Sequence, residues 1–97
     1  MYNKKSQNFF WNKKLAEKIA LKEGIILTLD HWEIIYLLRM LYKKFNTIPN
    51  VRMLILSLKK KHGNLKGNST HIFNLFPKGP IQQASKIAGL PKSNICL

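Results

Sequence analysis

Apolar side chains recur every three or four positions along most of the chain, a spacing typical of α-helices that bury one face. The longest such stretch runs from Leu29 to about Phe45, and its apolar positions nearly surround the helix axis. We therefore expect this helix to lie in the middle of the fold. Its predicted core positions are Ile34, Leu37, Leu38, Leu41 and Phe45, with Trp32, Ile35, Met40 and Tyr42 widening the apolar surface.

A shorter helix is predicted before this stretch. Asn12 is a good N-cap for it, and Gly24 stops it after about Glu23. Trp11, directly before the cap, is expected to anchor the helix by packing. Thr28 caps the long helix in the same way.

Three more helices are predicted after the long one. The helix that follows next has Pro49 at its first position. It ends in the lysine run 59–61, where cations complement the negative end of the helix dipole. The second is capped by Ser69 and ends at Phe76, and the third runs from the turn at residues 78–80 to Ala88. The buried face of the second is expected to consist of Ile72, Phe73, Leu75 and Phe76.

These elements predict a single all-α domain over residues 1–97. No strand-like alternation continues for more than a few residues, so the expected fold is a small bundle of about five short helices. Residues 90–97 follow a glycine and a proline and show no periodicity. We expect them to form a mobile C-terminal arm.

Charge adds a possible partner to this picture. The chain has 97 residues, with 17 Lys and Arg against 4 Asp and Glu, for a formal net charge of +13. Such an excess attracts anionic surfaces, including nucleic acid, but the strong preference for Lys over Arg also fits compositional drift. Both interpretations stay open. The N-terminus resembles no secretory signal, so we expect a cytoplasmic protein without membrane contact.

The chemistry that the chain can support centres on Cys96, its only cysteine and next-to-last residue. A single cysteine excludes an internal disulfide, and the scattered histidines His31, His62 and His71 form no ligand set, so no metal or cofactor is expected. A thiol on a mobile arm can carry sulfur between partners. Cations favour its thiolate form, and the candidates in sequence are Lys92, Lys78 and Lys86.

Ordered motifs then suggest a family. The segments GNST-x-x-x-x-LFPKGP (67–80) and KIAGLPK (86–92), followed by the penultimate cysteine, resemble the DsrC/TusE family. Upstream, DHWEII (30–35) and VRML (51–54) match the same family in order. The resemblance implies an N-terminal hairpin that is shortened or absent here.

The resemblance also implies a function. The sulfite-reductase-associated branch of the family has a second cysteine eleven positions before the last, where this chain has Ser85. That favours the TusE-like branch, a sulfurtransferase role in which Cys96 carries sulfur as a persulfide. The implied donor is a TusBCD-like complex, through its TusD subunit. The implied acceptor is an MnmA-like tRNA thiolase, with tRNA as a further candidate partner, for 2-thiolation of wobble uridine.

Two rival functions and one further departure from the family pattern remain. The chain is alternatively a basic helical nucleic-acid-binding module with an incidental cysteine, or a DsrC-type sulfite reductase partner, which Ser85 disfavours. Thr70, His71 and Asn74 replace an Arg, a Tyr and an Arg of the family's usual segment. Arg52 keeps its family position, either as an ion-pair anchor or as a contact to the arm.

Overall fold

The computed structural model describes residues 11–91, which fold into helices without strands. The expectation of an all-α bundle of five helices is confirmed for this part of the chain. Within it, no helix is long and apolar enough to span a bilayer, and no cluster of side chains could hold a metal ion. The helices are α2 (Lys13–Lys22), α3 (Leu29–Phe45), α4 (Val51–His62), α5 (Ser69–Leu75) and α6 (Pro80–Ile87).

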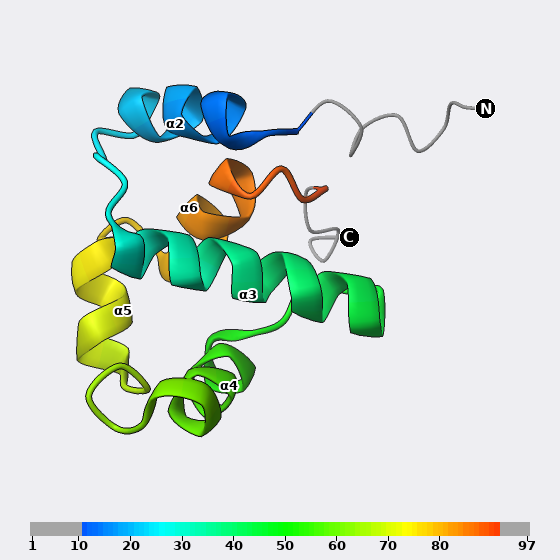
Figure 1. Ribbon diagram of the computed structural model, residues 1–97, viewed down its shortest axis with the longest axis vertical. Helices are drawn as coiled ribbons and strands as arrows, with labels where there is room; N and C mark the ends of the chain where they lie inside the picture. The colour runs from blue at the N-terminus through cyan, green and yellow to red at the C-terminus, as the bar shows by residue number, and fades with distance from the viewer. Residues whose placement is uncertain (1–10, 92–97) are drawn as a thin grey trace.

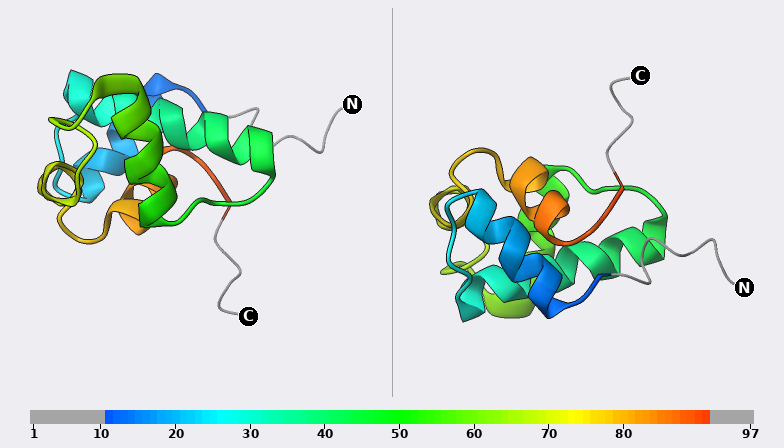
Figure 2. Two further views of the ribbon diagram at one scale, coloured as in Figure 1. Left: turned by 90° about the horizontal axis from the view of Figure 1, so that it is seen from below. Right: turned by 90° about the horizontal axis from the view of Figure 1, so that it is seen from above.

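The long helix α3 is the centre of the arrangement, as its apolar circumference predicted (Figure 1). In Figure 1, α2 lies on one side of α3 and α4 on the other, while α5 closes one end. Figure 2 shows from two further sides that α6 lies beside α3. Ile34, Ile35 and Leu38 of α3 are completely buried, so the core is built around this helix.

Both ends of α2 follow from local capping. The Asn12 side chain accepts a hydrogen bond from the Leu15 backbone N–H at 2.9 Å. At the other end Gly24 adopts a φ of 79°, and the Ile25 N–H donates to the carbonyl of Ala20 at 2.8 Å. This pairing is the Schellman motif, which glycine favours because it has no Cβ. The predicted limits of this helix are confirmed.

The first turn of α3 is tied to the end of α5 through His31. Thr28 caps the helix, and His31 Nδ1 lies 3.1 Å from the Thr28 backbone N. The other ring nitrogen of His31 lies 3.0 Å from the Leu75 carbonyl oxygen, and the ring packs edge-on against Phe76. Burial lowers the pKa of His31 below its ordinary value, although the Leu75 carbonyl opposes this shift.

Two predicted helix starts are wrong by a residue or two. The cap of α4 is Asn50, whose side chain accepts from the Met53 N–H at 2.9 Å, so Pro49 lies before the helix. The cap of α5 is Asn68 and Ser69 is already helical. In both cases the asparagine side chain reaches the third N–H of the helix, and its neighbour therefore does not cap.

Some predicted core positions are also wrong. Phe45 is 49% exposed and Met40 is similarly exposed, because α3 extends beyond its neighbours at its C-terminal end (Figure 1). Phe73 is exposed as well. The short helix α5 buries one face, centred on Ile72 and Phe76, and Phe73 lies at the edge of that face.

Candidate functional site

The candidate sulfur-carrying residue, Cys96, lies outside the described residues, and so does Lys92. The structure does describe the residues from which the predicted arm leaves the bundle, Gly89 to Pro91, which we term the arm root. The arm root directly follows α6, so the packing of α6 decides where the arm begins.

Two backbone hydrogen bonds and a positive φ define the conformation at the arm root. The Gly89 N–H donates to the Lys86 carbonyl at 3.2 Å, and the Leu90 N–H donates to the Ser85 carbonyl at 3.0 Å. Gly89 has a φ of 73°. Together these features form a second Schellman motif, which ends α6 and turns the chain away from its axis. The predicted end of this helix at Ala88 is confirmed to within one residue.

Two side chains from distant parts of the sequence hold this turn, and we term them the Trp11–Arg39 clamp. Trp11 Nε1 donates to the Ile87 carbonyl at 2.8 Å. The Arg39 guanidinium lies over the Trp11 ring, 3.9 Å from its centroid, and donates to the Ala88 carbonyl. The clamp satisfies two carbonyls that the end of α6 would otherwise leave without partners. Trp11, predicted to anchor the following helix by packing, does pack against the core and in addition binds the end of α6.

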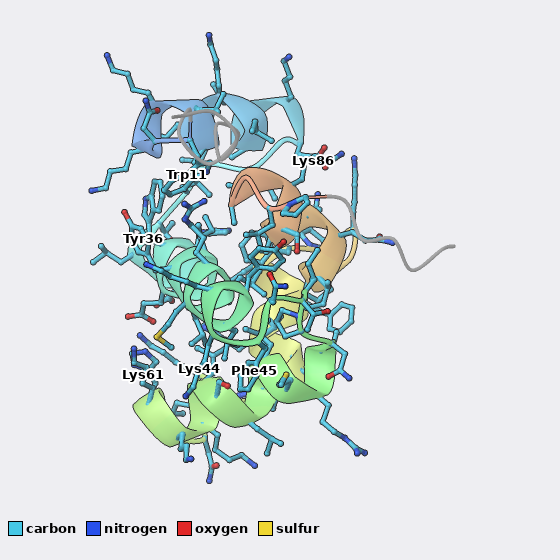
Figure 3. The ribbon with its side chains drawn as sticks, turned by 90° about the vertical axis from the view of Figure 1, so that its right-hand side faces the viewer. Trp11, Tyr36, Lys44, Phe45, Lys61 and Lys86 are labelled. Carbon is cyan, nitrogen blue, oxygen red and sulfur yellow. The ribbon has the colours of Figure 1, made fainter. Side chains whose placement is uncertain are left out.

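The clamp continues into an aromatic cluster along α3. Tyr36 meets Trp11 edge-on with ring centroids 6.3 Å apart, as their adjacent positions in Figure 3 illustrate. Trp32 stacks on Tyr36 at 5.5 Å. Burial lowers the pKa of Arg39 below its ordinary value, and the guanidinium stays charged. A stacked guanidinium of this kind stabilises a fixed geometry because its planar fork is already organised.

Sequence reasoning missed the role of Arg39. A signal was available, because Arg39 lies three residues after Tyr36 and seven after Trp32, on one helix face. A lone cation within an aromatic stripe points to a stacking interaction.

Two hollows flank the arm root, and Leu90 borders both. The first, of about 300 Å³, lies between α6 and Ile48, and Ser85 and Pro91 also line it. The second, of about 660 Å³, lies beside the C-terminal half of α3, where Arg39 and Lys43 supply its cationic groups. The arm root therefore lies between an apolar hollow and a cationic one.

Ser85 occupies the position at which the sulfite-reductase branch was expected to carry its second cysteine. Its side chain is 8% exposed, and its hydroxyl oxygen has no hydrogen-bond partner among residues 11–91. Because Ser85 lines the hollow next to Pro91, the position is close to the start of the arm. A buried hydroxyl therefore lies at this position, beside the arm root.

The cations expected to favour a thiolate are only partly available. Lys86 pairs with Glu23, with Nζ and Oε2 2.9 Å apart, so its charge is already balanced. A hydrogen bond from Gln83, together with Lys86, lowers the pKa of Glu23 and keeps it ionised. Lys78 is exposed and makes no ion pair within the described part of the chain. Two further cations, Arg39 and Lys43, line the second hollow together with Leu90.

The other residues singled out by sequence lie elsewhere. Arg52 is exposed on α4 and forms no ion pair with any described acidic side chain, so its expected role as an anchor finds no support there. Thr70 and Asn74 are exposed on α5, and the His71 N–H donates to the Asn68 cap at 2.8 Å. None of these residues borders the two hollows at the arm root.

Comparison with known proteins gives a consistent result. A profile of the family described as DsrC like protein matches residues 5–97. The sulfurtransferase TusE of Buchnera aphidicola from Acyrthosiphon pisum is 54% identical over 96 residues, which cover 99% of this chain and 82% of that protein. The sulfurtransferase TusE of Yersinia pseudotuberculosis is 49% identical over 87 residues, which cover 90% of this chain and 81% of that protein.

Solved structures resemble the fold as well. The NMR structure of Allochromatium vinosum DsrC has a TM-score of 0.79 and 41% identity, covering 90% of this chain and 78% of that one. The oxidised γ-subunit of the dissimilatory sulfite reductase (DsrC) of Archaeoglobus fulgidus has a TM-score of 0.77 and 39% identity, covering 88% and 78% of the two chains.

Proposed function

Because the chain belongs to the family of DsrC-like proteins, we propose that it is a sulfurtransferase that carries sulfur on Cys96 within a relay of proteins. The observation that carries this proposal is the set of TusE sulfurtransferases that are about half identical over nearly the whole chain. The penultimate cysteine supplies the reactive atom that such a carrier needs. The whole chain acts as one domain, with residues 90–97 as its delivery arm.

The proposed chemistry is an exchange without net oxidation. The Cys96 thiolate attacks the outer sulfur of a donor persulfide, a new S–S bond forms, and the donor leaves as a thiolate. The product is a persulfide on Cys96, which hands its outer sulfur to the acceptor. Cations near the start of the arm favour the attacking thiolate, and Arg39 and Lys43 are the described candidates.

Ser85 supports a one-way relay over a redox cycle. A hydroxyl cannot form an S–S bond, so Cys96 has no partner within this chain for an internal disulfide. The persulfide therefore has no internal thiol to attack it and stays available for transfer. A sulfite reductase partner that cycles through an internal sulfur bridge is correspondingly disfavoured.

We propose a TusBCD-like complex as the donor, through its TusD subunit, and an MnmA-like tRNA thiolase as the acceptor. The sulfur then enters position 2 of wobble uridine in tRNA. Both reactions would take place in the cytoplasm, where thiols stay reduced. These assignments rest on the TusE relatives and on the lone penultimate cysteine.

A reconstituted relay tests the proposal. The purified protein is mixed with the donor complex, the thiolase and unmodified tRNA, and 2-thiouridine is measured after digestion of the tRNA. We expect thiolation that depends on the protein and disappears in Cys96→Ser, whereas Ser93→Ala, a change on the same arm, leaves it intact. Thiolation by Cys96→Ser at the wild-type rate would refute the proposal and favour the rival in which the cysteine is incidental.

A further inference from the structure

Helix α4 buries one face in the core and carries two further apolar side chains, Met53 and Leu56, away from that face. Leu54 and Leu58 point into the core and are almost completely buried. Met53, Leu56, Ser57 and Lys60 follow the spacing i, i+3, i+4, i+7 on the opposite side, which we term the outer face of α4. Leu56 at its centre is 56% exposed. A helix that only has to cover a core needs no exposed leucine on its other side.

The outer face is hollowed rather than flat. Met53, Leu56 and Ser57, with Lys59 and Lys60, line a shallow groove of about 420 Å³. Figure 3 shows that α4 forms one edge of the molecule, with α2 at the far side. The groove is therefore separate from the arm root and takes no part in the sulfur chemistry proposed above.

Positive charge borders this groove on both sides. Arg52 and Lys59 lie along one side of the helix and Lys61 along the other, and α4 contains no acidic residue. The acidic residues of α3 are already paired, because Lys66 lies 3.1 Å from Asp30 and 3.0 Å from Glu33. Within the described part of the chain, the lysines of the 59–61 run make no ion pair.

We propose that the outer face of α4 docks an acidic amphipathic helix of a partner protein. Apolar side chains of such a helix would cover Met53 and Leu56, and its flanking carboxylates would meet the bordering cations. An RNA backbone fits less well, because phosphates would pair with the lysines but leave the apolar centre of the groove uncovered. The proposal goes beyond sulfur transfer and does not require Cys96 to react.

A titration of the full-length, ¹⁵N-labelled protein tests the proposal at physiological salt. The probe is a synthetic helical peptide of about fifteen residues with leucines at i, i+3, i+4 and i+7 and glutamates beside them. The control peptide has the same composition in an order that destroys the apolar face. We expect the amphipathic peptide to shift the amide signals of Met53, Leu56 and Lys60, with an affinity at least tenfold higher than that of the control peptide.

Matched variants locate the site. Leu56→Ser is expected to weaken binding about tenfold, because a partner that covers the exposed Leu56 side chain gains from removing its apolar surface from water. Leu21→Ser is the control, because Leu21 is 66% exposed on α2 and also lies among lysines. It should leave binding unchanged, as should Cys96→Ser, so that failure of this proposal and failure of the sulfur-carrier proposal are distinguishable.

Three outcomes would overturn the docking proposal. The two peptides could bind with equal affinity, which would show that net charge alone, and not an apolar helix face, causes the binding. The two leucine variants could behave alike, which would remove the outer face as the site. Finally, tRNA could shift the same α4 signals equally in wild type and Leu56→Ser while the peptide shifts none, which would assign the face to RNA.

Discussion

Replacement of Gly89 by alanine tests how tightly the arm root is held. Gly89 has a φ of 73°, a conformation that costs a residue with a Cβ about 1–2 kcal/mol. A Cβ at this position would also lie 2.8 Å from Cγ of Trp11 and closer still to its Cδ1. The indole would therefore have to move, and the substitution should act on the clamp as well as on the backbone.

The size of this second effect follows from what Trp11 contacts. Displacing the ring weakens its hydrogen bond to the Ile87 carbonyl, which contributes about 0.5–1.5 kcal/mol. It also disturbs the stacked Arg39, an interaction of about 0.5–2 kcal/mol. With the backbone cost included, Gly89→Ala is expected to lower the free energy of unfolding by about 2–4 kcal/mol.

Gly24→Ala provides the matched control. Gly24 ends α2 in the same Schellman geometry with a φ of 79°, but a Cβ there would meet nothing within 4 Å. It should cost only the backbone term of about 1–2 kcal/mol. Urea unfolding followed by circular dichroism measures both free energies. Equal losses for the two variants would show that Trp11 does not confine the arm root, and the account of the clamp would be wrong.

Three further predictions address the clamp, the helix caps and pH. Arg39→Lys keeps the charge but loses the planar stack on Trp11, so urea unfolding should show a loss of about 1–2 kcal/mol; no loss would contradict the clamp. Asn68→Ala should cost about 1 kcal/mol while Ser69→Ala is nearly neutral by the same assay, and the reverse order would restore Ser69 as the cap. Because burial lowers the pKa of His31, its neutral form is favoured in the folded state. The free energy of unfolding should therefore be highest above the ordinary pKa of 6.5 and fall as the pH drops below that value. His31→Gln should reduce this fall, which unfolding curves recorded between about pH 5 and 7.5 would measure.

Local sequence signals were sufficient for most of the fold. Asn12, Thr28 and Gly24 act on backbone groups within a few residues, so their effect can be inferred from neighbouring positions. The same reasoning placed two helix starts incorrectly, because Asn68 and Ser69 are adjacent residues that both favour caps. Which of them caps depends on the loop, where the Asn68 amide also donates to the Asn64 and Leu65 carbonyls.

The missing information concerns contacts between distant positions. Arg39 and Trp11 are 28 residues apart, and Arg39 and Ala88 are 49 apart, so no periodic pattern indicates that they meet. The exposure of Phe45 likewise depends on how far the neighbouring helices extend along α3. The sequence of α3 alone gives no information about those lengths. The candidate sulfur carrier, in contrast, was predicted from position alone, because Cys96 is the only thiol.

The most direct test of the central claim is the intact mass of the protein after incubation with a persulfide donor. The account predicts a gain of one sulfur atom, about 32 Da, that a reductant removes and that Cys96→Ser abolishes. The protein in which Ser85 is replaced, Ser85→Ala, should load equally, since the hydroxyl forms no sulfur bond. No adduct on the wild-type protein, under conditions that load a known persulfide carrier, would contradict the assignment of Cys96 as the sulfur-carrying residue.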